Sequence, residues 1–342
     1  MNDRILQHYL EEFRLGSDVE PAEAETLFDA LISGENQSMI AELLNAWNEK
    51  GTTEDELFEF ACVMRGRMKR ITSTHDAFVD VVGTGGSKAK TFNVSTAAAF
   101  VIAGADMPVA KHGNRAATSS SGSADVLSLL GVEVDTEPEV SERHLNEDGI
   151  CFMFAPRFHS LSSTLSKARR SLSRPTIFNN LGPLCNPALA PHQVIGVWDK
   201  HLLESTARVL SRLGAKRSWI VYGENGLDEI ALKGSTLVAE INGEQIEVFE
   251  ISAVDFEVYS LGNDLPLNCT ADKSAAVIRD ILENKMTDRD AERLVLINAA
   301  AALYVAGETA DLPTAYDLAT ESIRSGSAWR KLNKLSLTTT VR

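Results

Sequence analysis

The chain has 342 residues, of which 44% are hydrophobic, and 48 acidic residues against 33 basic ones give it a formal net charge of −15. This length suits one large domain or two ordinary ones, and the composition is that of a globular chain rather than a disordered one. The acidic balance argues against a general binder of nucleic acid or anionic membrane, because such proteins need basic surface to neutralise phosphate.

The charge is unevenly distributed along the chain. Residues 1–60 contain 15 acidic and three basic residues, a net charge of −12. Residues 83–123 carry a net charge of +3, and residues 157–174 carry +5 with no acidic residue. Basic islands in an acidic protein favour a small anionic ligand.

The four cysteines, Cys62, Cys151, Cys185 and Cys269, form no CxxC pair and no cluster with zinc-ligand spacing. We therefore expect buried free thiols in a reducing compartment. The N-terminal residues lack the apolar segment of a signal peptide, and no apolar run reaches the roughly 18 residues of a membrane span. A cytoplasmic protein is expected.

The first seventy residues are predicted to be entirely helical. Apolar residues recur at helical spacing within 5–13, 27–32 and 39–47. Thr53 followed by Glu56 forms a capping-box pattern at the start of a fourth helix. Helices this short need partners for their apolar faces, so we expect a small bundle open to contact with a second subunit.

From about residue 78 the pattern changes to short apolar runs that alternate with helices. The predicted strands are FVDVVG, MPVAKHG, ICFMFAP, QVIGVW and SWIVYG, and the predicted helices span 93–105, 121–131, 200–213, 273–284 and 289–305. This alternation predicts an α/β fold with a mainly parallel central sheet flanked by helices, in which ligands bind at the carboxyl ends of the strands. Residues 236–251 are predicted to form a hairpin around Asn242-Gly243.

The first strand-end loop, residues 83–96, has the composition of a phosphate or pyrophosphate site. Its glycines allow backbone N–H groups to approach a ligand, and the helix that starts near 93–95 adds its positive end. Short neutral donors accompany them: Thr84, Thr91, Asn93, Ser95 and Thr96. Neither the dinucleotide nor the P-loop fingerprint is present, and a purely structural glycine turn remains the alternative.

The second strand-end loop lies within residues 110–131 and is equally rich in donors. It contains Lys111, His112, Asn114, Arg115 and several serines. Two such loops favour a polyanionic ligand. His112 is as readily explained by a structural hydrogen bond as by acid–base chemistry.

Two further features concern a metal ion and a carboxylate. Asp228 and Glu229 follow a predicted strand and suit Mg²⁺, although an adjacent acidic pair is as readily explained as solvated surface. The basic segment 157–174 offers an arginine that could bind a substrate carboxylate through two parallel hydrogen bonds. Residues 176–187, rich in Asn, Gly and Pro, are interpreted as an ordered loop.

In this order and spacing, GTGG, TFNVST, KHGNRA, GSADVL, FMFAP, PTIFNNLGPLCNPA and GLDEI closely resemble the anthranilate phosphoribosyltransferases. These belong to the nucleoside phosphorylase-like phosphoribosyltransferases, and pyrimidine nucleoside phosphorylases share the KHGNRA and GSADVL blocks. The resemblance implies a small N-terminal α-helical domain (1–70, joined by part of 160–190) that mediates homodimerisation, beside a large α/β domain (78–342). It also implies Mg²⁺-dependent transfer of phosphoribose from 5-phosphoribosyl 1-pyrophosphate (PRPP) to anthranilate, in tryptophan biosynthesis.

The resemblance also implies the site residues. Contacts to PRPP are expected from Gly83, Gly86, Ser87, Thr91, Asn93, Val94, Ser95, Thr96, Lys111, His112, Gly113, Asn114, Arg115, Ala116, Ala117, Thr118, Ser119 and Ser123. Magnesium ligands are expected from Ser95, Asp228 and Glu229, and anthranilate contacts from Gly83, Asn114 and Arg169. Lys111, Asn114 and Arg115 are the expected catalytic residues, since a weakly basic amine needs no strong general base.

Three departures from the family pattern leave alternatives open. The family usually has Asp where this chain has Ser87, and a neutral residue where it has Lys90. The segment 159–163 also differs from the usual sequence, and it is expected to shape the acceptor pocket. The alternatives are another aromatic amine acceptor, a pyrimidine nucleoside phosphorylase, or a non-catalytic nucleic-acid-binding relative.

Overall fold

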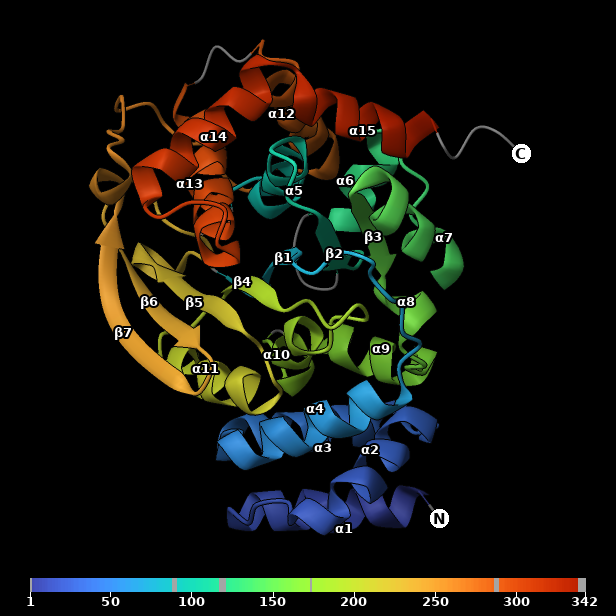
Figure 1. Ribbon diagram of the computed structural model, residues 1–342. Helices are drawn as coiled ribbons and strands as arrows, with labels where there is room; N and C mark the ends of the chain where they lie inside the picture. The colour runs from blue at the N-terminus through green and yellow to red at the C-terminus, as the bar shows by residue number, and fades with distance from the viewer. Residues whose placement is uncertain (1, 88–90, 117–120, 173, 286–288, 338–342) are drawn as a thin grey trace.

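The computed structural model describes residues 2–87, 91–116, 121–172, 174–285 and 289–337. A seven-stranded sheet lies at the centre, with helices on both of its faces (Figure 1). The N-terminal helices form a layer at the foot of the view (Figure 1). Three helices within residues 163–212 lie between this layer and the sheet (Figure 1). This arrangement confirms the predicted α/β fold with an N-terminal helical region.

The sheet has the strand order β3-β2-β1-β4-β5-β6-β7. Five strands are parallel: β1 (Val79–Gly83), β2 (Val109–Gly113), β3 (Ile150–Phe154), β4 (His192–Gly196) and β5 (Arg217–Gly223). The antiparallel strands β6 (Ser235–Asn242) and β7 (Gln245–Ser252) extend one edge and form the predicted hairpin. All five predicted parallel strands are therefore confirmed, and their carboxyl ends meet at one edge of the sheet.

The four N-terminal helices are α1 (Asn2–Leu15), α2 (Ala24–Ser33), α3 (Gln37–Lys50) and α4 (Glu54–Arg67). The predicted capping box at Thr53 and Glu56 starts α4. The apolar faces of α1–α4 share one core with α9 (Ser163–Ser171), α10 (Ile177–Leu184) and α11 (Leu202–Arg212). This core reaches the sheet at Ile195 and Ile220. The short helix α8 (Ala155–Phe158) follows β3.

The opposite face of the sheet carries a second core. The helices there are α5 (Val94–Gly104), α6 (Ser123–Leu129), α12 (Ala271–Leu282), α13 (Arg289–Ala306), α14 (Leu312–Arg324) and α15 (Ser327–Leu337). Helix α7 (Pro138–Arg143) packs against the edge strand β3. Short helical turns lie at Pro21–Glu23, His144–Asp148, Glu224–Gly226 and Ala253–Phe256. Helix α5 is buried along nearly its whole length, so the helix that follows the first glycine loop is rigidly supported.

One sequence interpretation was wrong. The sequence predicts a loop over 176–187, but helix α10 begins at Ile177 and ends at Leu184. Its apolar residues fall at helical spacing and are buried against the N-terminal helices, and this tertiary contact outweighs the local turn propensity of Asn, Gly and Pro. Pro183 lies in the last turn of this short helix.

Two other sequence expectations concern the environment of the protein. None of the helices in the described ranges combines the length and the hydropathy needed to cross a membrane. All four cysteines are free; three are buried, whereas Cys62 is partly exposed.

Candidate active site

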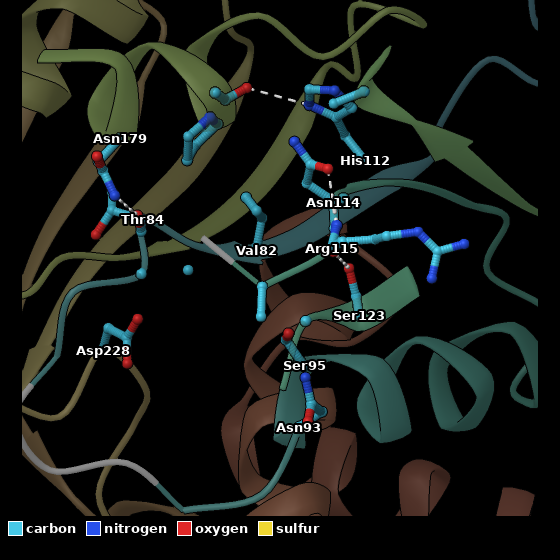
Figure 2. Close-up of a pocket in the computed structure, with 18 of the residues that line it drawn as sticks. Val82, Thr84, Asn93, Ser95, His112, Asn114, Arg115, Ser123, Asn179 and Asp228 are labelled. Atoms are coloured by element: carbon cyan, nitrogen blue, oxygen red, sulfur yellow. Dashed lines mark hydrogen bonds between the residues drawn. The ribbon is translucent and has the colours of Figure 1, made fainter. Parts of the chain in front are cut away.

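A cavity of about 370 Å³ opens at the carboxyl ends of the parallel strands. Figure 2 shows Asp228 on one side of this cavity, and Asn114 and Ser123 on the opposite side. Both donor-rich loops, the acidic pair and Arg169 line it, so residues from distant parts of the chain meet at one place. Among the residues expected to contact PRPP, the lining includes Gly83, Ser87, Thr91, Asn93, Ser95, Lys111, His112, Gly113, Asn114, Arg115, Ala116 and Ser123.

Among the described residues expected to contact PRPP, Gly86, Val94 and Thr96 do not line the cavity. Val94 and Thr96 are fully buried within α5, where they face the core rather than the cavity. Gly86 adopts a positive φ of 87° and packs against Pro175, where a Cβ would approach the proline ring to 2.4 Å. Ala117, Thr118, Ser119 and Lys90 lie outside the described residues.

The first loop is packed closely against the segment that carries the acidic pair. A Cβ at Gly83 would lie 2.7 Å from the Asp228 carboxylate, and one at Gly196 would lie 1.8 Å from the Asp228 carbonyl oxygen. The hydroxyl of Ser87 donates a 2.6 Å hydrogen bond to the carbonyl of Gly226. The absence of a side chain at Gly83 and Gly196 thus allows the ends of β1 and β4 to contact Asp228. Ser87 links the first loop to the turn at Gly226, just before Asp228.

The acidic pair provides the oxygen ligands that suit Mg²⁺. Burial, together with the negative charge of Asp228, raises the pKa of Glu229 well above its usual range. Thr91 donates a 3.2 Å hydrogen bond to the Glu229 carboxylate. Within the described ranges no group of three His, Cys, Asp or Glu residues is placed to hold a metal. A cation here would take the two carboxylates and complete its shell with neutral oxygens, as Mg²⁺ commonly does.

Lys111 brings a buried cation to the cavity wall. Its ammonium group donates to the carbonyl of Val81 at 2.7 Å and to the hydroxyl of Ser95 at 3.3 Å. Burial lowers the pKa of Lys111 to about 8, although the carboxylate of Asp80 opposes this shift. Asp80 is itself fully buried, which raises its pKa to about 6. Lys111 therefore supplies positive charge in a poorly solvated place, where electrostatic interactions are strong.

The second loop is held by its own salt bridge. The guanidinium of Arg115 lies 3.0 Å from Asp125, which also accepts hydrogen bonds from the backbone N–H groups of Ala116 and Gly122. In Figure 2 the Arg115 side chain extends away from Asp228 and the middle of the cavity. In this conformation the Arg115 side chain stabilises the loop through Asp125. The backbone N–H of Arg115 donates a hydrogen bond to the side-chain oxygen of Asn114.

His112 forms a buried pair with His159. The Nδ1 atom of His112 lies 3.1 Å from the carbonyl of Gly182, and its Nε2 atom lies 3.2 Å from Nε2 of His159. A carbonyl only accepts, so Nδ1 of His112 donates and its Nε2 accepts from His159. Burial lowers the pKa of both rings, that of His159 to about 4. His112 is thus satisfied by structural hydrogen bonds although it lines the cavity.

Arg169, on α9, is the arginine of the basic segment that lines the cavity. Its guanidinium stacks 5.2 Å from the centre of the Phe178 ring, and Nη2 lies 3.5 Å from the amide oxygen of Asn179. Its Nε atom is buried and has no hydrogen-bond partner among the residues that the structure describes. Burial, together with the positive charge of Arg170, lowers the pKa of Arg169 to about 10. By contrast, Arg157 and Arg174 form ion pairs with acidic residues outside the segment.

Several lining residues were not expected from the sequence. Asn179 lines the cavity from α10, and its amide donates a 3.2 Å hydrogen bond to the carbonyl of Thr84 (Figure 2). Met64, from α4, and Phe178 also line it. Because 176–187 was interpreted as a loop, the sequence did not indicate that one face of α10 lines the cavity. No local pattern marks Met64 as a site residue.

Residues 75–329 match the glycosyl transferase family, α/β domain, which places the chain among enzymes that transfer sugar groups. An anthranilate phosphoribosyltransferase from Rhodopseudomonas palustris is 44% identical over 322 residues, 94% of each chain. The crystal structure of the enzyme of that name from Thermus thermophilus is 34% identical, with a TM-score of 0.86 over 96% of this chain and 98% of that one. The Saccharomyces cerevisiae enzyme in complex with PRPP and Mg has the same fold, with 24% identity, a TM-score of 0.87 and 98% coverage of both chains.

The chain belongs to the anthranilate phosphoribosyltransferase family. The family resemblance, the fold and the enzyme class expected from the sequence are thereby confirmed.

Proposed function

We propose that the chain transfers phosphoribose from PRPP to anthranilate with Mg²⁺, giving N-(5-phosphoribosyl)anthranilate and pyrophosphate, in tryptophan biosynthesis. The observation that carries this proposal is the composition of one cavity. Two donor-rich loops and a carboxylate pair suit a magnesium-bound pyrophosphate, and Arg169 suits the carboxylate of an acceptor. A Saccharomyces cerevisiae relative was crystallised with PRPP and Mg, and another structure of it holds 4-fluoroanthranilate.

In the proposed reaction the bond between the anomeric carbon and the pyrophosphate oxygen breaks as a bond to the amine nitrogen forms. The leaving pyrophosphate gains negative charge, which the ammonium of Lys111 and the N–H groups of the glycine loop stabilise. Once its lone pair is used, the amine nitrogen carries a positive charge and loses a proton, which the released pyrophosphate accepts. Because this lone pair is already free, the site needs to orient the amine rather than deprotonate it first. Asn114 is proposed to assist this orientation.

Asp228 and Glu229 would hold the magnesium ion, which neutralises pyrophosphate charge when bound. Ser95 is proposed as a third oxygen ligand, and its hydroxyl already accepts a hydrogen bond from Lys111. The buried Glu229 carboxylate, next to a second carboxylate, is a group whose ionised form a cation would stabilise.

A second candidate keeps this reaction but changes the acceptor to another aromatic amine. The observation that favours it is that His159 and Leu161, from the segment that departs from the family pattern, line the cavity together with Arg169. Arg169 favours a carboxylated acceptor in either case.

We further propose that the enzyme works as a cytoplasmic homodimer. Residues 1–70, joined by part of 160–190, would form the smaller, dimerising domain beside the α/β domain of 78–342. The packing of α3 on α9 and of α4 on α10 supports this grouping.

An assay of the purified protein with PRPP, Mg²⁺ and anthranilate tests the proposal. Loss of anthranilate fluorescence together with release of one pyrophosphate per anthranilate consumed is the expected result. A panel of other aromatic amines, with and without a carboxylate, decides between the two acceptors. Absence of turnover with anthranilate at every Mg²⁺ concentration would rule out the first candidate.

Replacing Arg169 with Ala is expected to raise the KM for anthranilate by about 10- to 100-fold, because a charge-assisted hydrogen bond contributes about 1.5–3 kcal/mol. The KM for PRPP should change little. Steady-state kinetics with each substrate varied in turn measure both constants. The neighbouring Arg170, which is exposed, provides the control variant Arg170→Ala. Equal increases in both KM values would refute the role proposed for Arg169.

A further inference from the structure

The segment that carries Asp228 and Glu229 forms hydrogen bonds, on the side of the core, with a side chain from a helix distant in the sequence. Asn298 lies on α13, 68 residues along the chain from Ile230. Its amide oxygen accepts a 2.9 Å hydrogen bond from the N–H of Ile230, and its amide nitrogen donates a 3.1 Å bond to the carbonyl of Ile230. One side chain therefore satisfies both backbone polar groups of the residue next to Glu229.

This contact is buried and fixed in orientation. Ile230 is fully buried and Asn298 is 7% exposed, so water cannot readily replace either hydrogen bond. A third bond, 2.8 Å from the Asn298 amide nitrogen to the carbonyl of Leu294, fixes the side chain against its own helix. The amide plane of Asn298 thus sets where the backbone of Ile230 can lie.

Other contacts of the segment come from the side of the cavity, and Gly196 at the end of β4 lies against the Asp228 carbonyl. Ser87 binds the carbonyl of Gly226, Gly83 lies against Asp228, and Thr91 binds Glu229. All three belong to the first loop, which also lines the cavity. Asn298 reaches the segment from helix α13 in the core, independently of that loop.

We propose that Asn298 is a positioning residue, whose paired hydrogen bonds to Ile230 hold Asp228 and Glu229 in the direction required for metal-bound PRPP. The inference rests on the proposed function, since it assigns the acidic pair to the metal. Asn298 does not line the cavity, so it acts through the backbone of Ile230 and not on substrate.

The test compares the full-length Asn298→Ala enzyme with Ser322→Ala. Ser322 is the matched control because its buried hydroxyl also donates to a backbone carbonyl, that of Val101, within the same core but away from the acidic segment. Three readouts are used: amide hydrogen exchange at Ile230, Mn²⁺ binding in the presence of PRPP by electron paramagnetic resonance, and the KM values for PRPP and anthranilate.

Asn298→Ala is expected to speed exchange at Ile230 and to weaken Mn²⁺ binding by about 10- to 100-fold, as loss of a supporting hydrogen bond does at metal sites. The KM for PRPP should rise and the KM for anthranilate should not. Ser322→Ala should lower thermal stability and leave the ratio of the two KM values unchanged. Unchanged Mn²⁺ binding, or an equal increase of both KM values, would overturn the proposal.

A measurement on the unmodified protein covers the case in which Asn298→Ala does not fold. The Ile230 amide should be protected from exchange as strongly as the amides of β5 in the absence of any ligand, and rapid exchange would overturn the proposal. Failure of the proposed function would be seen separately, as absence of turnover in the unmodified enzyme with Ile230 protected.

Discussion

Replacing Lys111 with Met is expected to lower kcat/KM for PRPP by about 10²–10³-fold, the effect of removing one preorganised charged donor from an enzyme site. Met keeps the aliphatic volume of lysine but removes the ammonium group beside Val81 and Ser95. Because this group is 4% exposed, little solvent screens its interaction with a leaving pyrophosphate. Both kcat and kcat/KM should fall, since the charge to be stabilised grows in the transition state.

Steady-state kinetics with PRPP varied at saturating anthranilate measure this effect. Lys167→Met is the control, because Lys167 is an exposed lysine on α9 and does not line the cavity. Circular dichroism of both variants shows whether the fold is kept. A decrease of less than about threefold for Lys111→Met would be too small for a charge that stabilises the leaving group.

Replacing Glu56 with Ala is expected to lower the free energy of unfolding by about 3–5 kcal/mol, the usual cost of breaking a buried ion pair on one side. Glu56 is 1% exposed and lies 2.9 Å from the ammonium of Lys50, whose side chain is 4% exposed. It also accepts hydrogen bonds from the N–H groups of Val19 and Thr53 and from the indole of Trp47. One carboxylate therefore joins the loop before α2, helix α3 and the start of α4.

Urea denaturation followed by circular dichroism measures this loss. Glu42→Ala is the control, because Glu42 forms an exposed pair with Arg14 and such pairs contribute only about 0–1 kcal/mol. The double variant Glu56→Leu with Lys50→Met should be more stable than Glu56→Ala, since in Glu56→Ala the buried Lys50 side chain keeps only the exposed Asp18 as its ionic partner among the described residues. A loss below about 1 kcal/mol for Glu56→Ala would contradict the central role of this carboxylate in the N-terminal helices.

Local patterns predicted most of the secondary structure correctly. The parallel strands are short and mostly buried, as expected of strands covered on both faces, although polar residues such as Asp80 and Lys111 interrupt their apolar runs. Strands β1 and β2 end at Gly83 and Gly113, where a donor-rich loop begins. The prediction failed at α10, because its turn-forming residues are held in a helix by apolar contacts with residues more than a hundred positions away. Long-range contacts of this kind leave no local signal.

In the candidate site, too, the sequence indicated some residues, whereas the contacts of others depend on long-range packing. Lys111 and Asp228 were singled out from their local context and Arg169 through the family resemblance, and all three line one cavity. Arg115 was expected at the pyrophosphate, yet in this structure it is bound to Asp125, ten residues further along the chain. Asn298 lies within an apolar helix and carries no sequence pattern of a site residue, because its partner Ile230 is brought to it only by the packing of α13 on the sheet.

The sequence by itself determined the alternation of strands and helices, the glycine loops and the family, because periodicity, glycine placement and motif order are properties of the chain read in one dimension. Only the tertiary structure decided which polar side chains line one cavity and which side chain extends away from it. It also decided which core residue supports the segment of Asp228 and Glu229. The reason is physical: a hydrogen bond or ion pair depends on distances of about 3 Å between atoms whose separation is set by the packing of the whole core.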